Sequence, residues 1–271
     1  MHKKIIYSDL DGTLFNNENG KIYISDVNVE AVNKWIDDEN YFSVATGRNI
    51  IGVRQYFSKS KIKHNLPMVL SNGTVLYDYD NDKIIFQELI NKEVLNEAIS
   101  FALNTDKALL LLMAANENFI LKNESYAMPW VDFQHTVISK NEIDYNIINK
   151  AGFLLKKEDF NEVYEKVKNF KSIDTIELIP SSKVFIEFVN KGTSKATGIK
   201  RLLEHLSITD YRLYAIGDFD NDIDMLKDAH ISFAPKGAQK KVLEVVDHIL
   251  CDNNDGSVAE MITKLNNELN K

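Results

Sequence analysis

The chain alternates short apolar runs with polar or glycine-bearing clusters, and this order recurs near both ends. Runs bounded in this way are typical of buried strands. They are Ile5–Ser8, Tyr41–Ala45 and Met68–Leu70 in the first part, and Tyr211–Ile216, Ile231–Ala234 and His248–Cys251 in the last. Residues 27–38 place apolar side chains at positions 29, 32, 35 and 36, the spacing of one helix face, with Asp26 as a candidate cap. Strands alternating with helices predict βαβ units and a parallel sheet.

The middle of the chain follows a different pattern. Leu109–Met113 and Phe119–Leu121 flank a short polar segment, which predicts a hairpin. Thr175–Ile179 and Val184–Val189 predict a second hairpin, and residues 158–170 have the apolar spacing of a helix. We therefore expect an α/β protein whose parallel-sheet core comprises residues 1–81 and 189–271. An α+β unit of residues 82–188 is inserted into this core.

The composition is that of a globular protein, with 44% apolar and 27% charged residues in a chain of 271. The net charge of −8 disfavours binding to nucleic acid or to an anionic membrane. Cys251 is the only cysteine, so no intrachain disulfide can form, which suits a reducing compartment. Residues 108–115 form the longest apolar run, which is too short to span a membrane. We expect a cytoplasmic protein.

The first predicted strand runs directly into Asp9-Leu10-Asp11-Gly12-Thr13. Carboxylates two residues apart in an extended segment lie on the same side of the chain, and Gly12 allows a sharp turn. Alone, this pattern also fits an ordinary acidic turn. A calcium loop would need an acid or amide where Thr13 stands, so that alternative fails.

Polar side chains also follow the other predicted strands. In open α/β sheets the carboxyl ends of the strands form the ligand site, so these residues should converge. Carboxylates for a divalent cation, together with hydroxyl, amide and ammonium donors, are the groups that phosphoryl transfer requires. The converging residues are Asp9, Asp11, Thr46, Gly47, Lys195, Asp218, Asn221 and Asp222.

The order and spacing of these motifs resemble the haloacid dehalogenase superfamily. Asn72-Gly73 and the acidic Asp252–Gly256 segment also resemble its Cof-type phosphatases. The resemblance covers essentially the whole length. It implies a Rossmann-like core with an α+β cap domain of type IIB inserted after the third core strand.

The resemblance also implies roles for individual residues. Asp9 would be the nucleophile that forms an aspartyl-phosphate, and Asp11 the general acid and base. Asp9, the backbone carbonyl of Asp11 and Asp218 would hold Mg²⁺. Asp222 would orient Lys195 or a metal-bound water, while the role of Arg48 stays open. The phosphoryl oxygens would be held by Thr46, Gly47, Lys195 and Asn221.

The implied activity is Mg²⁺-dependent hydrolysis of a small phosphorylated metabolite, a sugar phosphate or a related phosphomonoester. Two alternatives stay open. A phosphomutase would return the phosphoryl group from the same aspartyl-phosphate to the substrate. A sensor would bind phosphorylated metabolites without turnover. The sequence does not predict the oligomeric state.

Substrate specificity in this architecture would lie in the cap. Four residues in a polar and aromatic stretch of the insertion are candidates: Lys122, Tyr126, Trp130 and His135. An alternative for Tyr126 and Trp130 is that they only pack the interior of the cap.

Overall fold

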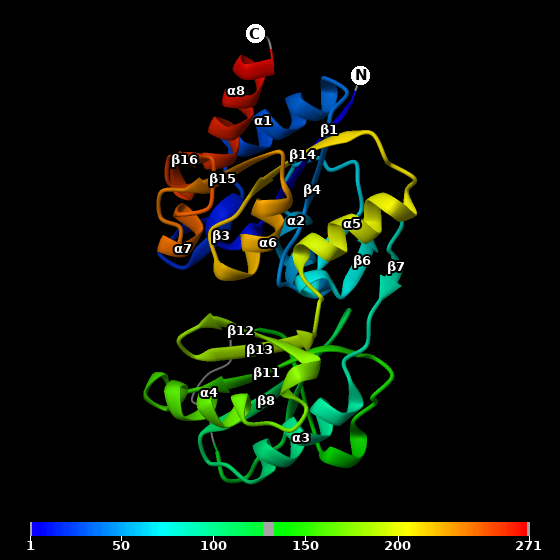
Figure 1. The fold of residues 1–271 in the computed structure, drawn as a ribbon, viewed down its shortest axis with the longest axis vertical. Coiled ribbons are helices and arrows are strands. Elements are labelled where there is room, and N and C mark those ends of the chain that lie inside the picture. Colours follow the sequence, from blue (N-terminus) through cyan, green and yellow to red (C-terminus); the bar gives the residue numbers. More distant parts are fainter. Residues whose placement is uncertain (1, 127–132, 270–271) are drawn as a thin grey trace. The chain divides into compact units, whose positions relative to one another are not determined.

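The structure, a computed structural model, describes residues 2–126 and 133–269. These residues form two compact units (Figure 1). The core unit comprises residues up to Ile85 and from Ser194 onward, and the cap unit is Phe86–Thr193. Both junctions lie a few residues later than the sequence predicts. Strand β7 (Lys83–Gln87) begins within the core unit, and the cap sheet is completed only by strand β13 (Phe185–Asn190).

Five parallel strands form the central sheet of the core unit, in the order β16-β15-β14-β1-β4. Each corresponds to a run predicted from the sequence. Ile5, Ile6 and Tyr7 of β1 are fully buried, as expected for a strand covered on both faces. The strands are β1 (Lys3–Ser8), β4 (Tyr41–Val44), β14 (Tyr211–Ile216), β15 (Ile231–Pro235) and β16 (His248–Leu250).

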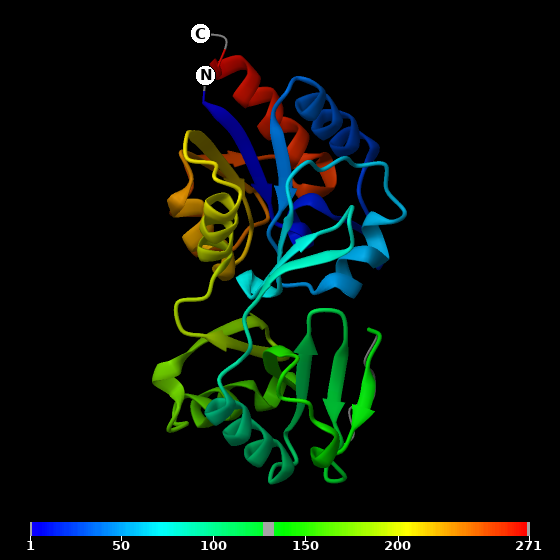
Figure 2. The ribbon, with the colours of Figure 1, turned by 90° about the vertical axis from the view of Figure 1, so that its right-hand side faces the viewer.

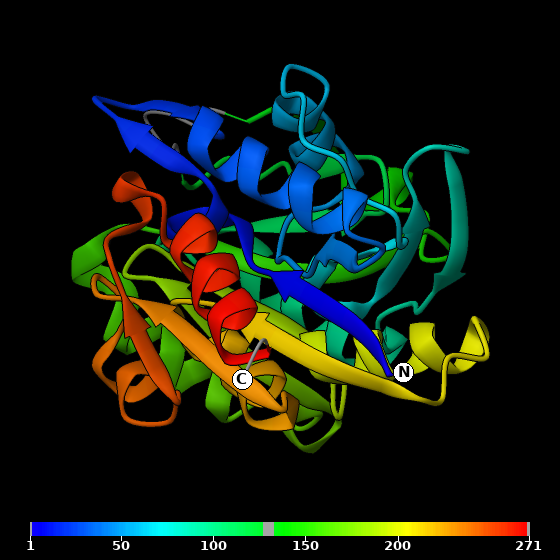
Figure 3. The same ribbon diagram turned by 90° about the horizontal axis from the view of Figure 1, so that it is seen from above.

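Helices cover both faces of this sheet. Helices α1 and α8 lie side by side on one face, and α5 and α6 lie on the other (Figures 2 and 3). The helix predicted at 27–38 is confirmed as α1, which buries Val29, Val32 and Trp35; Ser25, not Asp26, is its N-cap residue. The helices are α1 (Asp26–Asp37), α2 (Ile50–Phe57), α5 (Lys195–His205), α6 (Ile223–Asp228), α7 (Lys240–Leu243) and α8 (Ser257–Leu269).

The predicted strand at Met68–Leu70 differs from the other five. It is β5, and a single parallel bridge between Ala45 and Val69 joins it to the end of β4. Its main partner is the antiparallel strand β6 (Val75–Asp78), in a three-stranded sheet with β7. The reason is local, because the chain reverses directly after Leu70, whereas a parallel partner would need a long crossover. A hairpin of β2 (Asn16–Glu18) and β3 (Lys21–Tyr23) was not predicted.

The cap unit contains a six-stranded sheet in the order β10-β9-β8-β11-β13-β12. Both predicted hairpins are confirmed, as β8 with β9 and β12 with β13, and the predicted helix is α4. Strand β11 and helix α3 were not predicted. The remaining bounds are α3 (Lys92–Leu103), β8 (Ala108–Ala114), β9 (Asn118–Leu121), β10 (Thr136–Ile138), β11 (Ile148–Leu155), α4 (Phe160–Lys168) and β12 (Ile176–Ser182).

The two faces of the cap sheet carry different side chains. Phe153 and Ile186 share one apolar cluster with Val94 of α3 and Val163 of α4. Leu111 and Met113 belong to a second apolar cluster, because successive side chains of a strand alternate between faces. The buried ion pair of Lys150 and Glu187 is also part of this sheet.

No helix in the described ranges is long and apolar enough to cross a membrane.

The turn after β5 holds three consecutive residues with positive φ: Ser71 at 50°, Asn72 at 58° and Gly73 at 99°. Left-handed backbone costs energy for any residue with a Cβ, and least for asparagine and glycine. A Cβ on Gly73 would overlap the carbonyl oxygen of Ser194, just before α5. Glycine at 73 therefore lets the turn lie against the start of this helix.

We predict that Gly73→Ala destabilises the protein by at least about 3 kcal/mol, measured by urea unfolding. Left-handed backbone and overlap with Ser194 both contribute. Gly20→Ala is the matched control, since Gly20 also has positive φ but nothing lies within 4 Å of an added Cβ. It should cost only about 1 kcal/mol. Equal losses in the two variants would contradict the close approach of Gly73 to α5.

Candidate active site

Three neighbouring core strands end at the same level, and each delivers a predicted site residue. Ser8 at the end of β1 lies opposite Ile216 of β14 and Val44 of β4. The chain therefore places Asp9, Asp218 and Thr46 just beyond the ends of β1, β14 and β4, at the same edge of the sheet. This is the carboxyl edge of the sheet, where α/β proteins bind ligands.

Lys195 is the first residue of α5, and its side chain is fully buried between two carboxylates. Its Nζ donates to Asp9 Oδ1 at 2.5 Å and to Asp222 Oδ1 at 2.5 Å. Burial acts to lower the pKa of Lys195, but Asp222 and Asp9 outweigh it, so the net pKa is raised. The ammonium is therefore charged and fixed in place at neutral pH.

Asp222 also organises the loop after β14. Its Oδ2 accepts hydrogen bonds from the backbone N–H groups of Asp218 and Phe219, at 3.0 Å each. A Cβ on Gly217 would overlap the Asp222 carboxyl group, so glycine is required for this close approach. Asp222 thus links Lys195 to the loop that carries Asp218.

Asp9, Asp218 and Asp222 each place one carboxylate oxygen within 4.8 Å of the others. Burial raises the pKa of Asp9 well above its ordinary value, although Lys195 opposes this. Burial also raises the pKa of Asp218 from 3.8 to about 7, with Asp222 adding to the effect and the Thr13 hydroxyl, 3.0 Å away, opposing it. Three carboxylates and one ammonium leave two negative charges uncompensated when all are ionised. Such a donor set fits a hard divalent cation.

The carboxylate of Asp11 lies apart from this cluster and is exposed. Both of its oxygens accept from the guanidinium of Arg48, at 2.6 Å each, in a bidentate ion pair. Arg48 in turn lies over the rings of Tyr56 and Phe15, at 4.9 Å and 5.5 Å from the ring centroids. The sequence left the role of Arg48 open. In the structure Arg48 contacts Asp11 directly.

The predicted phosphate-binding residues Thr46, Gly47 and Asn221 are neighbours of the turn after β5. Thr46 is buried, and its Oγ1 accepts from the Arg48 N–H at 3.2 Å. Asn221 Nδ2 donates to Asn72 Oδ1 at 3.0 Å, and this oxygen lies 3.1 Å from the Cβ position of Gly47. Sequence reasoning gave Asn72 no role. The available signal was an Asn-Gly pair one residue beyond a predicted strand, which indicates left-handed backbone.

The four predicted specificity residues of the cap unit do not form one group. Lys122 is exposed and pairs with Glu124 at 3.1 Å. Tyr126 is buried in an apolar cluster with Leu109, Leu111 and Met113, the environment of a packing residue. His135 is half-buried and contacts the Phe133 carbonyl at 2.8 Å. Trp130 lies outside the described residues.

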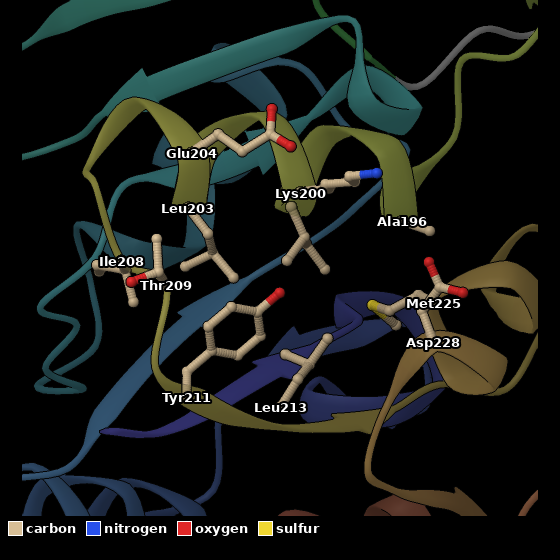
Figure 4. A pocket seen from close by; sticks show the side chains of 11 residues that line it. Ala196, Lys200, Leu203, Glu204, Ile208, Thr209, Tyr211, Leu213, Met225 and Asp228 are labelled. Carbon is tan, nitrogen blue, oxygen red and sulfur yellow. The ribbon is translucent and has the colours of Figure 1, made fainter. Parts of the chain in front are cut away.

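A cavity of about 330 Å³ lies elsewhere in the core unit, between α5 on one side and β14 and α6 on the other (Figure 4). Leu203, Leu213 and Met225 give it an apolar lining, and Lys200 and Glu204 add charges. No carboxylate of the buried cluster lines it. The candidate active site is therefore identified by its charges and not by this cavity.

Comparison with known proteins identifies the family of this chain. The family model for haloacid dehalogenase-like hydrolases matches residues 6–262. The 5-amino-6-(5-phospho-D-ribitylamino)uracil phosphatase YcsE of Bacillus subtilis is 29% identical, over 96% of this chain and 94% of that protein.

Solved structures give the same result. A HAD/COF-like hydrolase from Plasmodium vivax superimposes with a TM-score of 0.81 at 25% identity, covering 98% of this chain and 96% of that one. A sugar phosphatase of subclass IIB has the same fold, with a TM-score of 0.79 at 20% identity and coverage of 97% and 99%. The chain therefore belongs to the family of haloacid dehalogenase-like hydrolases and is a phosphoric monoester hydrolase.

Proposed function

We propose that this hydrolase is a Mg²⁺-dependent phosphatase that acts on small phosphorylated metabolites through an aspartyl-phosphate on Asp9. Sugar phosphates and related phosphomonoesters are the proposed substrate class. One observation carries the proposal: Asp9 is buried, held by Lys195, and lies within 4.8 Å of Asp218 and Asp222. The proposed acid and base, Asp11, is a separate and exposed carboxylate.

In the first half-reaction, a carboxylate oxygen of Asp9 attacks phosphorus and the bond to the leaving oxygen breaks. Lys195 already occupies Oδ1 of Asp9, so the ion pair favours attack by the other oxygen, Oδ2. Asp11 in its protonated form gives its proton to the leaving oxygen, so that the organic product departs as a neutral alcohol.

In the second half-reaction, water attacks the phosphorus of the aspartyl-phosphate and the bond from phosphorus to Asp9 breaks. Asp11, now ionised, takes the proton of that water, which restores both carboxyl groups and releases inorganic phosphate. In the structure each Asp11 oxygen accepts one N–H of Arg48, and each keeps a second lone pair through which it can exchange a proton with the leaving oxygen or the water.

Asp9, Asp218 and the backbone carbonyl of Asp11 would hold Mg²⁺. The fit rests on the two uncompensated negative charges of the buried cluster. When bound, the ion supplies positive charge that balances these carboxylates and the phosphoryl oxygens. Lys195, the Thr46 hydroxyl, the Gly47 amide and Asn221 would hold the remaining phosphoryl oxygens.

The Bacillus subtilis relative is named for a phosphorylated ribityl side chain on a uracil ring. This compound and simple sugar phosphates share a phosphomonoester on a polyhydroxylated carbon chain, so both belong in one substrate panel. Release of inorganic phosphate without an isomerised sugar phosphate separates a phosphatase from a phosphomutase. Absence of turnover across the panel with Mg²⁺ would favour the sensor alternative.

We predict that Asp9→Asn lowers kcat by on the order of 1,000-fold or more, because an amide oxygen cannot replace the carboxylate nucleophile. The assay is phosphate release from a phosphomonoester with Mg²⁺. Asp26→Asn is the matched control, since Asp26 is an exposed residue of α1. Activity of the Asp9→Asn enzyme above a tenth of wild type would exclude Asp9 as the nucleophile.

We predict that Mg²⁺ raises the thermal midpoint more at pH 8 than at pH 5. The pKa of Asp218 is raised to about 7 in the folded state from 3.8. Its ionisation therefore opposes folding: the folded state is favoured below the unfolded pKa, and that stability is lost as pH rises toward 7. A bound cation offsets the loss only when the carboxylate is ionised, by about 2 kcal/mol at a large excess over Kd.

Asp218→Asn should remove most of this pH dependence. Equal shifts at both pH values would contradict the metal assignment.

We predict that Lys195→Met abolishes detectable phosphatase activity and also destabilises the protein by about 3 kcal/mol or more. Removing the buried ammonium leaves Asp9 and Asp222 without their counter-charge. Unfolding in urea measures the loss. Lys200→Met on the exposed side of the same helix should change stability by less than about 0.5 kcal/mol. A fully stable Lys195→Met variant would show that the two ion pairs do not hold the site together.

A further inference from the structure

Asn72 is a buried asparagine in the turn after β5. This turn lies beside Thr46 and Gly47. Its φ of 58° lies in the left-handed region, which glycine adopts more easily. Its Nδ2 is buried and has no hydrogen-bond partner in the described part of the chain. A buried, unpaired donor is unfavourable. Glycine would therefore satisfy the backbone without this cost, so backbone conformation alone does not explain the asparagine.

The other end of the same amide has a partner. Asn72 Oδ1 accepts from Asn221 Nδ2 at 3.0 Å, across 149 residues of sequence. The Asn72 N–H donates to the Thr46 carbonyl at 3.0 Å, and the preceding Ser71 N–H donates to the Arg48 carbonyl at 2.9 Å. The turn thus binds the Thr46–Arg48 segment through its backbone and Asn221 through a side chain.

An asparagine amide has two N–H donors, and its terminal torsion angle is only weakly restricted. The contact with Asn72 occupies one donor of Asn221 and thereby fixes the direction of the second. A donor that is already oriented loses less freedom when it binds a phosphoryl oxygen.

We propose that Asn72 is a positioning residue for phosphate binding, which acts by holding the side-chain amide of Asn221 in place. The inference rests on the proposed function, in which Asn221 binds a phosphoryl oxygen. In this proposal Asn72 acts through Asn221 and not through a bond of its own to the phosphoryl group. Its loss weakens binding of the phosphoryl group and leaves the chemical step of the bound substrate largely intact.

The test is Asn72→Gly, which keeps the left-handed backbone and removes only the side chain. Inorganic phosphate with Mg²⁺ is the probe, measured as a competitive inhibitor of phosphomonoester hydrolysis. We expect Ki for phosphate and KM for substrate to rise by about 5-fold, the value of one hydrogen bond. The change in kcat should stay within about 2-fold. A merely structural role would lower kcat and the unfolding midpoint instead.

Asn221→Ala supplies the second arm. If Asn72 acts through Asn221, this variant raises Ki, and adding Asn72→Gly to it raises Ki no further. Ser71→Gly is the matched control, because Ser71 has φ of 50° and its buried Oγ has no hydrogen-bond partner among the described residues. It should leave Ki within about 2-fold of wild type.

Four results would overturn the inference: an unchanged Ki in Asn72→Gly, a fall in kcat and in the unfolding midpoint of that variant instead, an additive rise in the double variant, or an equal rise in Ser71→Gly. Failure of the proposed function looks different. In that case the wild-type protein itself would neither hydrolyse phosphomonoesters nor bind phosphate with Mg²⁺.

Discussion

The ammonium of Lys195 between Asp9 and Asp222 is the interaction on which the rest of the site depends. It joins the end of β1, the start of α5 and the loop after β14, three segments that are distant in sequence. Without it, the buried carboxylates of Asp9 and Asp222 would have no ion-pair partner among the described residues, and such clusters are costly. This one ammonium faces three carboxylates, so the cluster carries two uncompensated negative charges when all of them are ionised, and we propose that a divalent cation balances these charges.

Around this interaction, two glycines allow neighbouring segments of the chain to pack closely. Gly217 lets the Asp222 carboxyl reach the amides of its own loop, and Gly73 lets the turn after β5 lie against α5. Both glycines allow a close approach that a Cβ would block, and Gly73 also has a left-handed backbone conformation. The loops at this edge therefore fit against one another with little freedom, as expected for a site that must hold a small anion in one orientation.

Much of the core could be predicted from the sequence because each central strand is a short apolar run that ends in a polar cluster. The candidate site residues were predicted from their places at or just beyond these strand ends, and Lys195 from its place before a helix. Asn72 could not be assigned in this way, since its contact with Asn221 depends on a turn whose three left-handed residues leave only a weak sequence signal.

The pairing of β5 with β6 was also missed, because an apolar run does not reveal whether its neighbour is parallel. In the cap, β11 has buried residues on both faces and carries Lys150 and Asn149 among them, so its pattern resembles neither an alternating strand nor a helix.

The two proposed catalytic carboxylates have opposite relations to solvent. Asp9 and its partner Lys195 are buried, so dissolved ions screen their attraction very little. The carboxylate of Asp11 is 51% exposed and the side chain of Arg48 is 24% exposed, so solvent reaches this ion pair mainly from the Asp11 side. Ionic strength therefore acts on the two groups separately: added salt loosens the hold of Arg48 on Asp11 while the anchoring of Asp9 persists. The same sheet edge thus combines a proposed nucleophile that is shielded from salt with a proposed proton carrier whose ion pair responds to the surrounding solution.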